Sequence, residues 1–193
     1  MTFEIKHAEQ LSRGELLLRT FFGWLYIYIP HGFVLLFVGL WGAILGFIAF
    51  WAILFTGRYP QSFFEFRVGL IRWQTRLNAR VYNLADGYPA FGINGTDDAT
   101  KVEIPYPESL SRGLLLVKLF FGIFYVILPH GFVLFFLAIG AAFCLFIGWW
   151  AVLFTGRFPL SLHNYIVGYM RWSTRVGLYM QNMTDTYPPF SLD

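Results

Sequence analysis

Charged residues are scarce in this chain and make up only 13% of its 193 residues. Soluble domains carry about 25%, so this composition excludes an ordinary soluble domain. The single cysteine, Cys144, excludes an intrachain disulfide. Hydrophobic residues make up 57% of the chain, and the mean hydropathy is +0.56. The composition therefore predicts an integral membrane protein.

The sequence also lacks the short motifs that carry known chemistry. It has no phosphate-binding glycine loop, CxxC pair, HExxH motif or nucleophile elbow, and no carboxylate pair inside an apolar run. The net charge is +3, but no dense cluster of lysine and arginine indicates nucleic-acid binding. We therefore predict a protein that is not an enzyme, binds no nucleic acid and holds no metal or other cofactor.

An internal repeat organises the chain. Residues 11–94 align with residues 110–193 at a constant offset of 99 without a gap, and about 40 of the 84 aligned pairs are identical. Such a repeat indicates two copies of one structural unit, with residues 1–10 as a tail and residues 95–109 as a linker. The shared strings are LSRG (11–14 and 110–113), PHGFVL (30–35 and 129–134), LFTGR (54–58 and 153–157), RWxTR (72–76 and 171–175) and DxYPxF (86–91 and 185–190).

Each repeat opens with a long apolar run, which in repeat 1 extends from Leu16 to Thr56 and contains the tripeptide 30–32 (Pro-His-Gly). About 20 residues suffice to cross a bilayer, so the run is long enough for two crossings. Proline disfavours a helical residue before it and starts helices well, so Pro30 is expected to end one span and open the next. The prediction is an all-α integral membrane fold with four spans, at about 14–29, 31–55, 113–128 and 130–154.

Each apolar run is followed by an amphipathic segment, at residues 62–84 and 161–183. Aromatic and aliphatic residues form one stripe of this helix and arginines another, which suits a helix at the cytoplasmic membrane interface. Packing of the stripe on the protein's own spans or on a partner is an equal alternative.

The basic residues lie largely outside the apolar runs, and this predicts the topology. Two parallel hairpins would place these residues on one side of the membrane, which the positive-inside rule makes the cytoplasm, together with both termini. If the first segment of each repeat only re-entered the bilayer, each repeat would cross once. The hairpin is the preferred interpretation.

Two equivalent histidines, His31 and His130, follow the prolines of the two apolar runs. Histidine at such a place can cap the turn or lie at the membrane interface, which is the preferred interpretation. The alternative is that the pair ligates a haem or shares a metal. His7 and His163 have no counterpart in the other repeat and are interpreted as surface residues.

The charged residues of the amphipathic helices are the second candidate site. Asp86 and Asp185 are expected to form structural ion pairs that tie the DxYPxF segment onto the amphipathic helix, with an anion site as the alternative. The arginines expected to contact lipid headgroups or a partner are Arg58, Arg72, Arg76, Arg157, Arg171 and Arg175.

The strings LFTGRYP, RWxTR and DxYPPFSLD resemble the bacterial membrane family catalogued as domain of unknown function 4389, over nearly all of both repeats. The ending of repeat 1 departs from PPFSLD, with Ala90 and residues 92–94 in its place. The resemblance implies a protein of the bacterial inner membrane with a cytoplasmic amphipathic portion, and it implies no activity.

From the residues themselves we predict a non-enzymatic scaffold or accessory subunit of a larger membrane assembly. Its expected partners are other membrane proteins and lipids, above all lipids with anionic headgroups. Two alternatives stay open. One is a membrane protein that binds or helps transport lipids or amphiphiles, and the other is a haem-binding electron-transfer subunit that rests on His31 and His130 alone.

Overall fold

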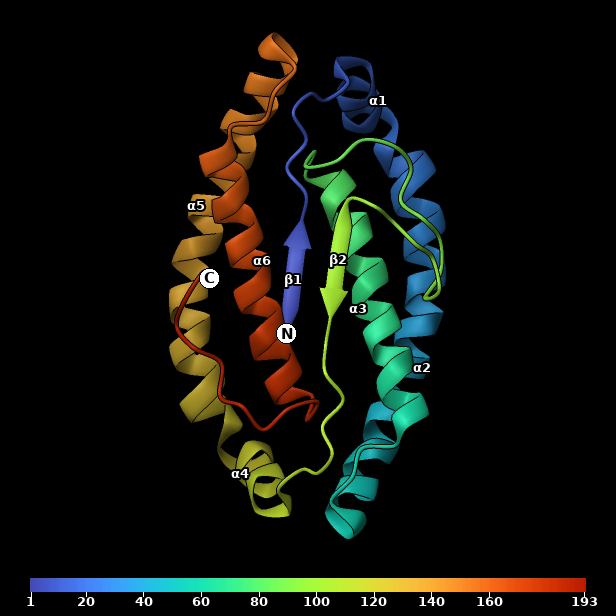
Figure 1. Cartoon of the computed structure of the whole chain (residues 1–193), viewed down its shortest axis with the longest axis vertical. Coiled ribbons are helices and arrows are strands. Elements are labelled where there is room, and N and C mark those ends of the chain that lie inside the picture. The colour runs from blue at the N-terminus through green and yellow to red at the C-terminus, as the bar shows by residue number, and fades with distance from the viewer.

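The first repeat folds into one very long helix and a shorter helix that returns along it (Figure 1). The computed structural model describes residues 1–193. Helix α1 (Arg13–Gly23), a π-helical segment (Trp24–Tyr28) and helix α2 (Ile29–Thr56) are continuous and span 44 residues. Helix α3 (Gln61–Val81) then runs back along α2.

The second repeat has the same sequence of elements. It contains α4 (Arg112–Gly122), a second π-helical segment (Ile123–Ile127), α5 (Leu128–Thr155) and α6 (Leu160–Met180). The prediction of a largely helical fold with two copies of one unit is confirmed. The two 44-residue helices are long and apolar enough to cross a membrane by length and composition.

The predicted hairpin at the proline is wrong, because the helix continues through it. Pro30 lacks an N–H group, which leaves the carbonyl four residues earlier, that of Tyr26, without its helical partner. The helix widens into the π-helical segment at this point, and the Tyr88 hydroxyl donates to the Tyr26 carbonyl at 3.2 Å. In repeat 2, Tyr187 donates to the Tyr125 carbonyl at 2.9 Å. The proline therefore bends the helix without ending it.

Two strands join the repeats. β1 (Thr2–Ile5) pairs antiparallel with β2 (Thr100–Glu103), so the predicted tail and linker supply a two-stranded ribbon. In this register Phe3 pairs with Val102. These two residues occupy equivalent positions, because the repeats are offset by 99 residues. An approximate two-fold axis therefore passes between these two residues. It sets the two long helices antiparallel (Figure 1), and the expected parallel arrangement is also wrong.

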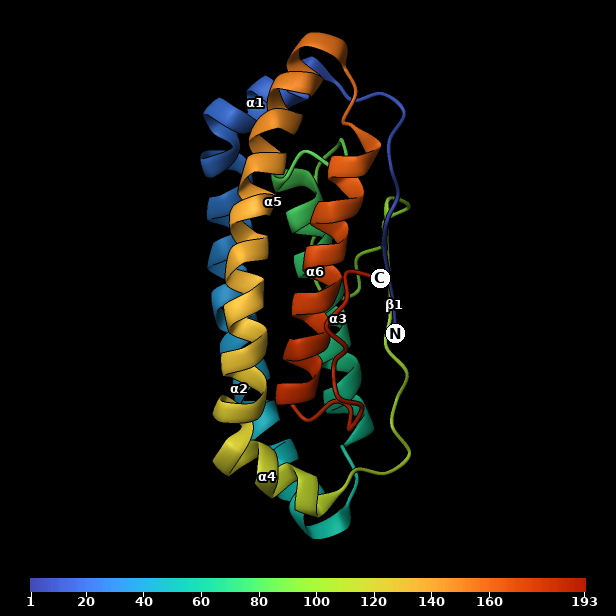
Figure 2. The same cartoon turned by 90° about the vertical axis from the view of Figure 1, so that its left-hand side faces the viewer.

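The elements form three layers (Figure 2). The long helices make the first layer, α3 and α6 the second, and the ribbon the third. Apolar side chains from the ribbon, such as Phe3 and Val102, are buried with Ala79 of α3 and Val167 of α6 in one core cluster. The core therefore lies largely within and beside the middle layer.

Each repeat is also fastened to the turn of the other. Gly57 and Gly156 end the long helices in the left-handed conformation, with φ of 72° and 73°, which glycine adopts without strain. The carbonyl of Gly156 accepts from the Leu11 N–H, and that of Gly57 from the Leu110 N–H, both at 2.8 Å. The shared LFTGR and LSRG strings thus meet across the repeats.

Candidate functional site

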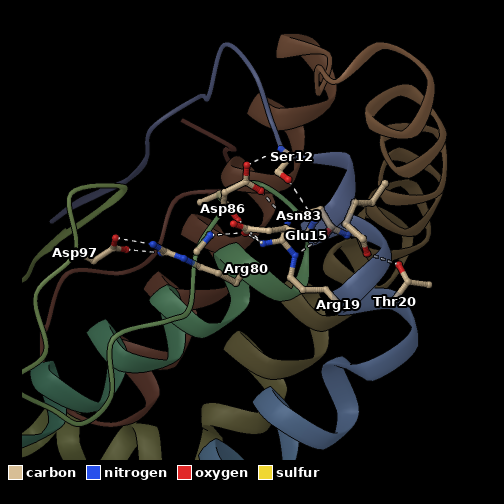
Figure 3. A network of polar contacts seen from close by, with 11 residues as sticks. Ser12, Glu15, Arg19, Thr20, Arg80, Asn83, Asp86 and Asp97 are labelled. Carbon is tan, nitrogen blue, oxygen red and sulfur yellow. Dashed lines mark hydrogen bonds and ion pairs between the residues drawn. The ribbon is translucent and has the colours of Figure 1, made fainter.

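Asp86 holds the start of the first long helix in place (Figure 3). Its carboxylate accepts from the Ser12 N–H at 2.6 Å and pairs with Arg19 at 3.0 Å. Arg19 also donates to Asn83, and its side chain is only 5% exposed. Asp86 does form an ion pair, but its partner lies on the long helix and not on α3. Asp185 repeats this arrangement with Ser111 and Lys118.

His31 is fully buried among aromatic rings. Its Nδ1 accepts from the indole N–H of Trp73 at 2.9 Å, and the rings of Tyr88 and Phe91 lie 5.2 and 4.6 Å away. The proline, the RWxTR tryptophan and the DxYPxF tyrosine and phenylalanine of repeat 1 therefore meet at one bend. Their presence in both repeats was the signal that could have predicted this cluster.

His130 lies in the equivalent cluster of repeat 2, with Trp172, Tyr187 and Phe190. It sits at the start of α5, and the starts of α2 and α5 lie towards opposite ends of the molecule (Figure 1). The structure therefore does not bring His31 and His130 together, and a ligand shared between them has no geometric basis. No group of three or more His, Cys, Asp or Glu side chains has the arrangement of a metal site.

Four of the six arginines expected at headgroups bind backbone carbonyls instead. The Nε of Arg72 donates to Val102 at 2.8 Å, and that of Arg171 donates to Phe3 at 3.0 Å, so both hold the ribbon. Arg76 donates to the carbonyls of Ala90, within the DxYPxF motif, and of Gly92, just after it, and Arg175 donates to the carbonyl of Ser191. Arg58 and Arg157, at the two turns, are exposed, and their guanidinium groups bind no other residue of the chain.

A buried ion pair fixes the linker to α3, and the sequence did not indicate it. Arg80 makes two hydrogen bonds to the Asp97 carboxylate, at 2.6 and 2.7 Å, and both side chains are 7% exposed (Figure 3). Burial raises the pKa of Asp97, but hydrogen bonds from Arg80, Thr100 and the Ala99 N–H outweigh it. The pKa of Asp97 therefore lies below its ordinary value.

His7 and His163 form a packed pair, and the prediction that His163 lies on the surface is wrong. The rings lie 5.1 Å apart, and each Nε2–H donates to a backbone carbonyl, that of Phe158 at 2.7 Å and that of Ile5 at 2.9 Å. His163 is only 2% exposed. The equivalent pair beside β2 consists of Tyr106 and Phe64, whose rings also meet edge to face but carry no imidazole.

This pair predicts a pH dependence of stability. Burial lowers the pKa of His163 below 6.5, and the neighbouring His7 adds to this. As the pH falls through 6.5, the histidine of the unfolded chain binds a proton, whereas that of the folded chain stays neutral. This histidine therefore leaves the free energy of unfolding unchanged above pH 6.5 and lowers it below that pH. We expect a decrease of up to about 1.4 kcal/mol per pH unit.

Denaturant unfolding in detergent between pH 8 and 5 measures the effect. The variant His7→Tyr/His163→Phe copies the pair of the other repeat and is expected to flatten this part of the profile. An unchanged profile in the variant would contradict the assignment.

The most extensive feature is the outer surface of the first layer. Large apolar side chains recur there along both long helices, and Phe33 and Phe132 are 65% and 68% exposed. Soluble proteins rarely expose contiguous apolar patches above a few hundred Å². We define the apolar face by Phe33, Phe37, Leu40, Trp41, Ile44, Phe47, Trp51 and Phe55 of α2 and by Phe132, Phe136, Ile139, Phe143, Phe146, Trp150 and Phe154 of α5.

The fold and this surface define a helical protein of two repeats related by an approximate two-fold axis, with an exposed apolar face. Residues 15–92 and 117–191 match the family described as Domain of unknown function (DUF4389). These two segments cover most of the chain, and the protein belongs to this family, as the sequence motifs predicted. No curated protein and no solved structure matches the chain.

Proposed function

We propose that this protein is a non-enzymatic scaffold or accessory subunit that lies in one leaflet of the membrane, with its long helices parallel to the membrane plane. The observation that supports this most is the apolar face on the layer of the long helices. The ribbon, which forms the opposite layer (Figure 2), exposes the charged side chains of Glu4, Lys101 and Glu103. One apolar and one polar side favour a position in the membrane interface over a crossing of the membrane.

The length of the apolar face favours this placement over a crossing. Helix α2 alone has 28 residues and is therefore about 42 Å long, whereas the hydrocarbon core is about 30 Å thick. The ribbon lies near mid-length of the molecule (Figure 1), and Lys101 and Glu103 on it are 59% exposed. A chain crossing alone would place these charges near the centre of the bilayer, which is costly.

The two-fold symmetry supports the same placement. The axis runs through the ribbon, across the layers, so a membrane plane perpendicular to it meets both repeats in the same way. Both apolar runs then enter to equal depth, and Arg58 and Arg157 lie at equal height. This proposal replaces the multi-pass arrangement with a single-leaflet one. The cytoplasmic side of the bacterial inner membrane stays the proposed location, since the net charge of +3 suits a leaflet with anionic lipids.

The polar layer then faces the cytoplasm and is free for a protein partner. It carries the ribbon and a pocket of about 430 Å³ lined by Arg72, Arg76, Lys101 and the linker. The two carboxylates in the lining of this pocket, Asp97 and Glu103, are both ion-paired. A scaffold that anchors a partner at the membrane fits these features best.

Native purification tests the proposal. We expect the protein to remain in the membrane fraction during alkaline carbonate extraction and, once purified, to float with vesicles. After extraction in a mild detergent, we expect a partner protein to copurify with it in constant stoichiometry. A protein that carbonate releases would contradict the membrane placement. A protein that is monodisperse, without a partner and active by itself would contradict the scaffold.

A further inference from the structure

A row of polar side chains on α3 points away from the ribbon. Arg67, Gln74 and Asn78 follow one another at intervals of seven and four residues, so they share one face of the helix. Arg72 and Arg76, which hold the ribbon and linker, lie on the opposite face. The row is therefore directed towards the layer of the long helices.

Gln74 and Asn78 of this row line one side of a cavity. Figure 1 shows α2 and α5 at the two lateral edges of the molecule, with α3 and α6 between them. A cavity of about 320 Å³ separates α3 from α6 and is lined by Gln74, Asn78, Ser173 and Gln181. On the ribbon side Phe3, which is 2% exposed, closes it. This cavity, whose polar lining consists of side chains of α3 and α6, is called the groove below.

Arg67 supplies a positive charge without a carboxylate partner beside the groove, where it contacts the lining residue Gln181. Its Nη1 donates to the Gly42 carbonyl of α2 at 2.5 Å, and its Nε (at 3.2 Å) and Nη2 both donate to the side-chain oxygen of Gln181. No carboxylate lies within ion-pair distance of it. A Cβ at Gly46 would lie 2.7 Å from its Nη1, so the glycine makes room for the guanidinium. Repeat 2 has Ile166 at the equivalent position, so the charge belongs to repeat 1 alone.

We propose that this groove binds one anionic phospholipid of the surrounding leaflet. The phosphate lies on Arg67, the polar headgroup enters the cavity between α3 and α6, and the acyl chains lie between α2 and α5. This inference rests on the single-leaflet placement, because only there do lipid headgroups point towards the middle layer. An arginine beside lipid needs an anionic partner, and a phosphate can accept from the two guanidinium N–H groups that Gly42 and Gln181 leave free.

The test counts phospholipids that remain bound to the purified protein in detergent, by native mass spectrometry. The wild type is expected to retain about one anionic phospholipid per chain, and Arg67→Gln is expected to weaken this binding at least about tenfold. Arg72→Gln is the matched control, because it removes an arginine from the opposite face of the same helix. It is expected to retain the lipid.

Further measurements distinguish a bound phospholipid from free phosphate and from other occupants of the groove. Vesicles of phosphatidylglycerol should protect the wild type against thermal unfolding more than vesicles of phosphatidylcholine, and Arg67→Gln should lose this difference. Equal protection by inorganic phosphate alone would overturn the lipid as ligand, as would lipid retention by Arg67→Gln or lipid loss from both variants. A dimer or partner helix in place of the lipid would overturn it too.

The single-leaflet placement is tested separately by flotation. Arg67→Gln is expected to float with vesicles like the wild type, since the apolar face is intact. Failure of the wild type to float would contradict the placement, whereas lipid loss with intact flotation supports the groove.

Discussion

Replacing Asp97 by asparagine is expected to lower the free energy of unfolding by about 3 to 5 kcal/mol. The substitution leaves the Arg80 guanidinium buried without its carboxylate, and both side chains are 7% exposed in the folded chain. Removing one partner of a buried pair costs more than the pair contributes, because the remaining charge stays desolvated. Denaturant unfolding in detergent, followed by tryptophan fluorescence, measures the loss.

The chain supplies a matched control for this prediction. Lys101 and Glu103 form an ion pair at 3.4 Å in which both side chains are 59% exposed. Glu103→Gln is expected to change stability by less than about 1 kcal/mol. The double change Arg80→Met/Asp97→Leu should recover much of the loss from Asp97→Asn, since no buried charge remains. Equal effects of Asp97→Asn and Glu103→Gln would contradict the burial argument.

Two lysines on the apolar face, Leu40→Lys with Ile139→Lys, are expected to reduce partitioning into vesicles by about a hundredfold or more. The two positions are equivalent in the repeats, and their side chains are 56% and 43% exposed. A lysine at the centre of a membrane helix costs about 2.5 to 3.5 kcal/mol on insertion scales, and part of this cost remains at smaller depth. Flotation at graded lipid concentration measures the change.

A control with the same change of charge lies on the ribbon. Glu4→Gln with Glu103→Gln also raises the net charge by two but leaves the apolar face untouched. This variant is expected to partition like the wild type. If it lost binding as strongly as the lysine variant, charge rather than the apolar face would control the association.

The sequence predicted much of the local structure. The amphipathic segments expected at 62–84 and 161–183 correspond to α3 and α6. Each helix ends slightly earlier, because Asn83 and Asn182 adopt the left-handed conformation that ends a helix. The internal repeat, with its offset of 99 residues, and the glycines Gly57 and Gly156 after the two apolar runs were also visible in the sequence.

What the sequence could not predict depends on contacts between distant residues. A proline usually ends a helix, and here it does not because Tyr88, 62 residues from Tyr26, satisfies the freed carbonyl. Asp86 was expected to pair with nearby arginines, but its partner Arg19 lies 67 residues away. Arg72 was expected at lipid headgroups because nothing in the sequence indicated that strand β2 would cover its face of α3.

The most direct test of the single-leaflet placement is the depth of α2 in the bilayer. Spin labels at Phe33, Trp41, Ile48 and Phe55, in a Cys144→Ser background, report the depth of each position by collision with lipid-soluble and water-soluble relaxants. The placement predicts similar depth at all four positions. A profile that is deepest near Trp41 and Ile48 and about 15 Å shallower towards the helix ends would show a crossing helix and contradict the account.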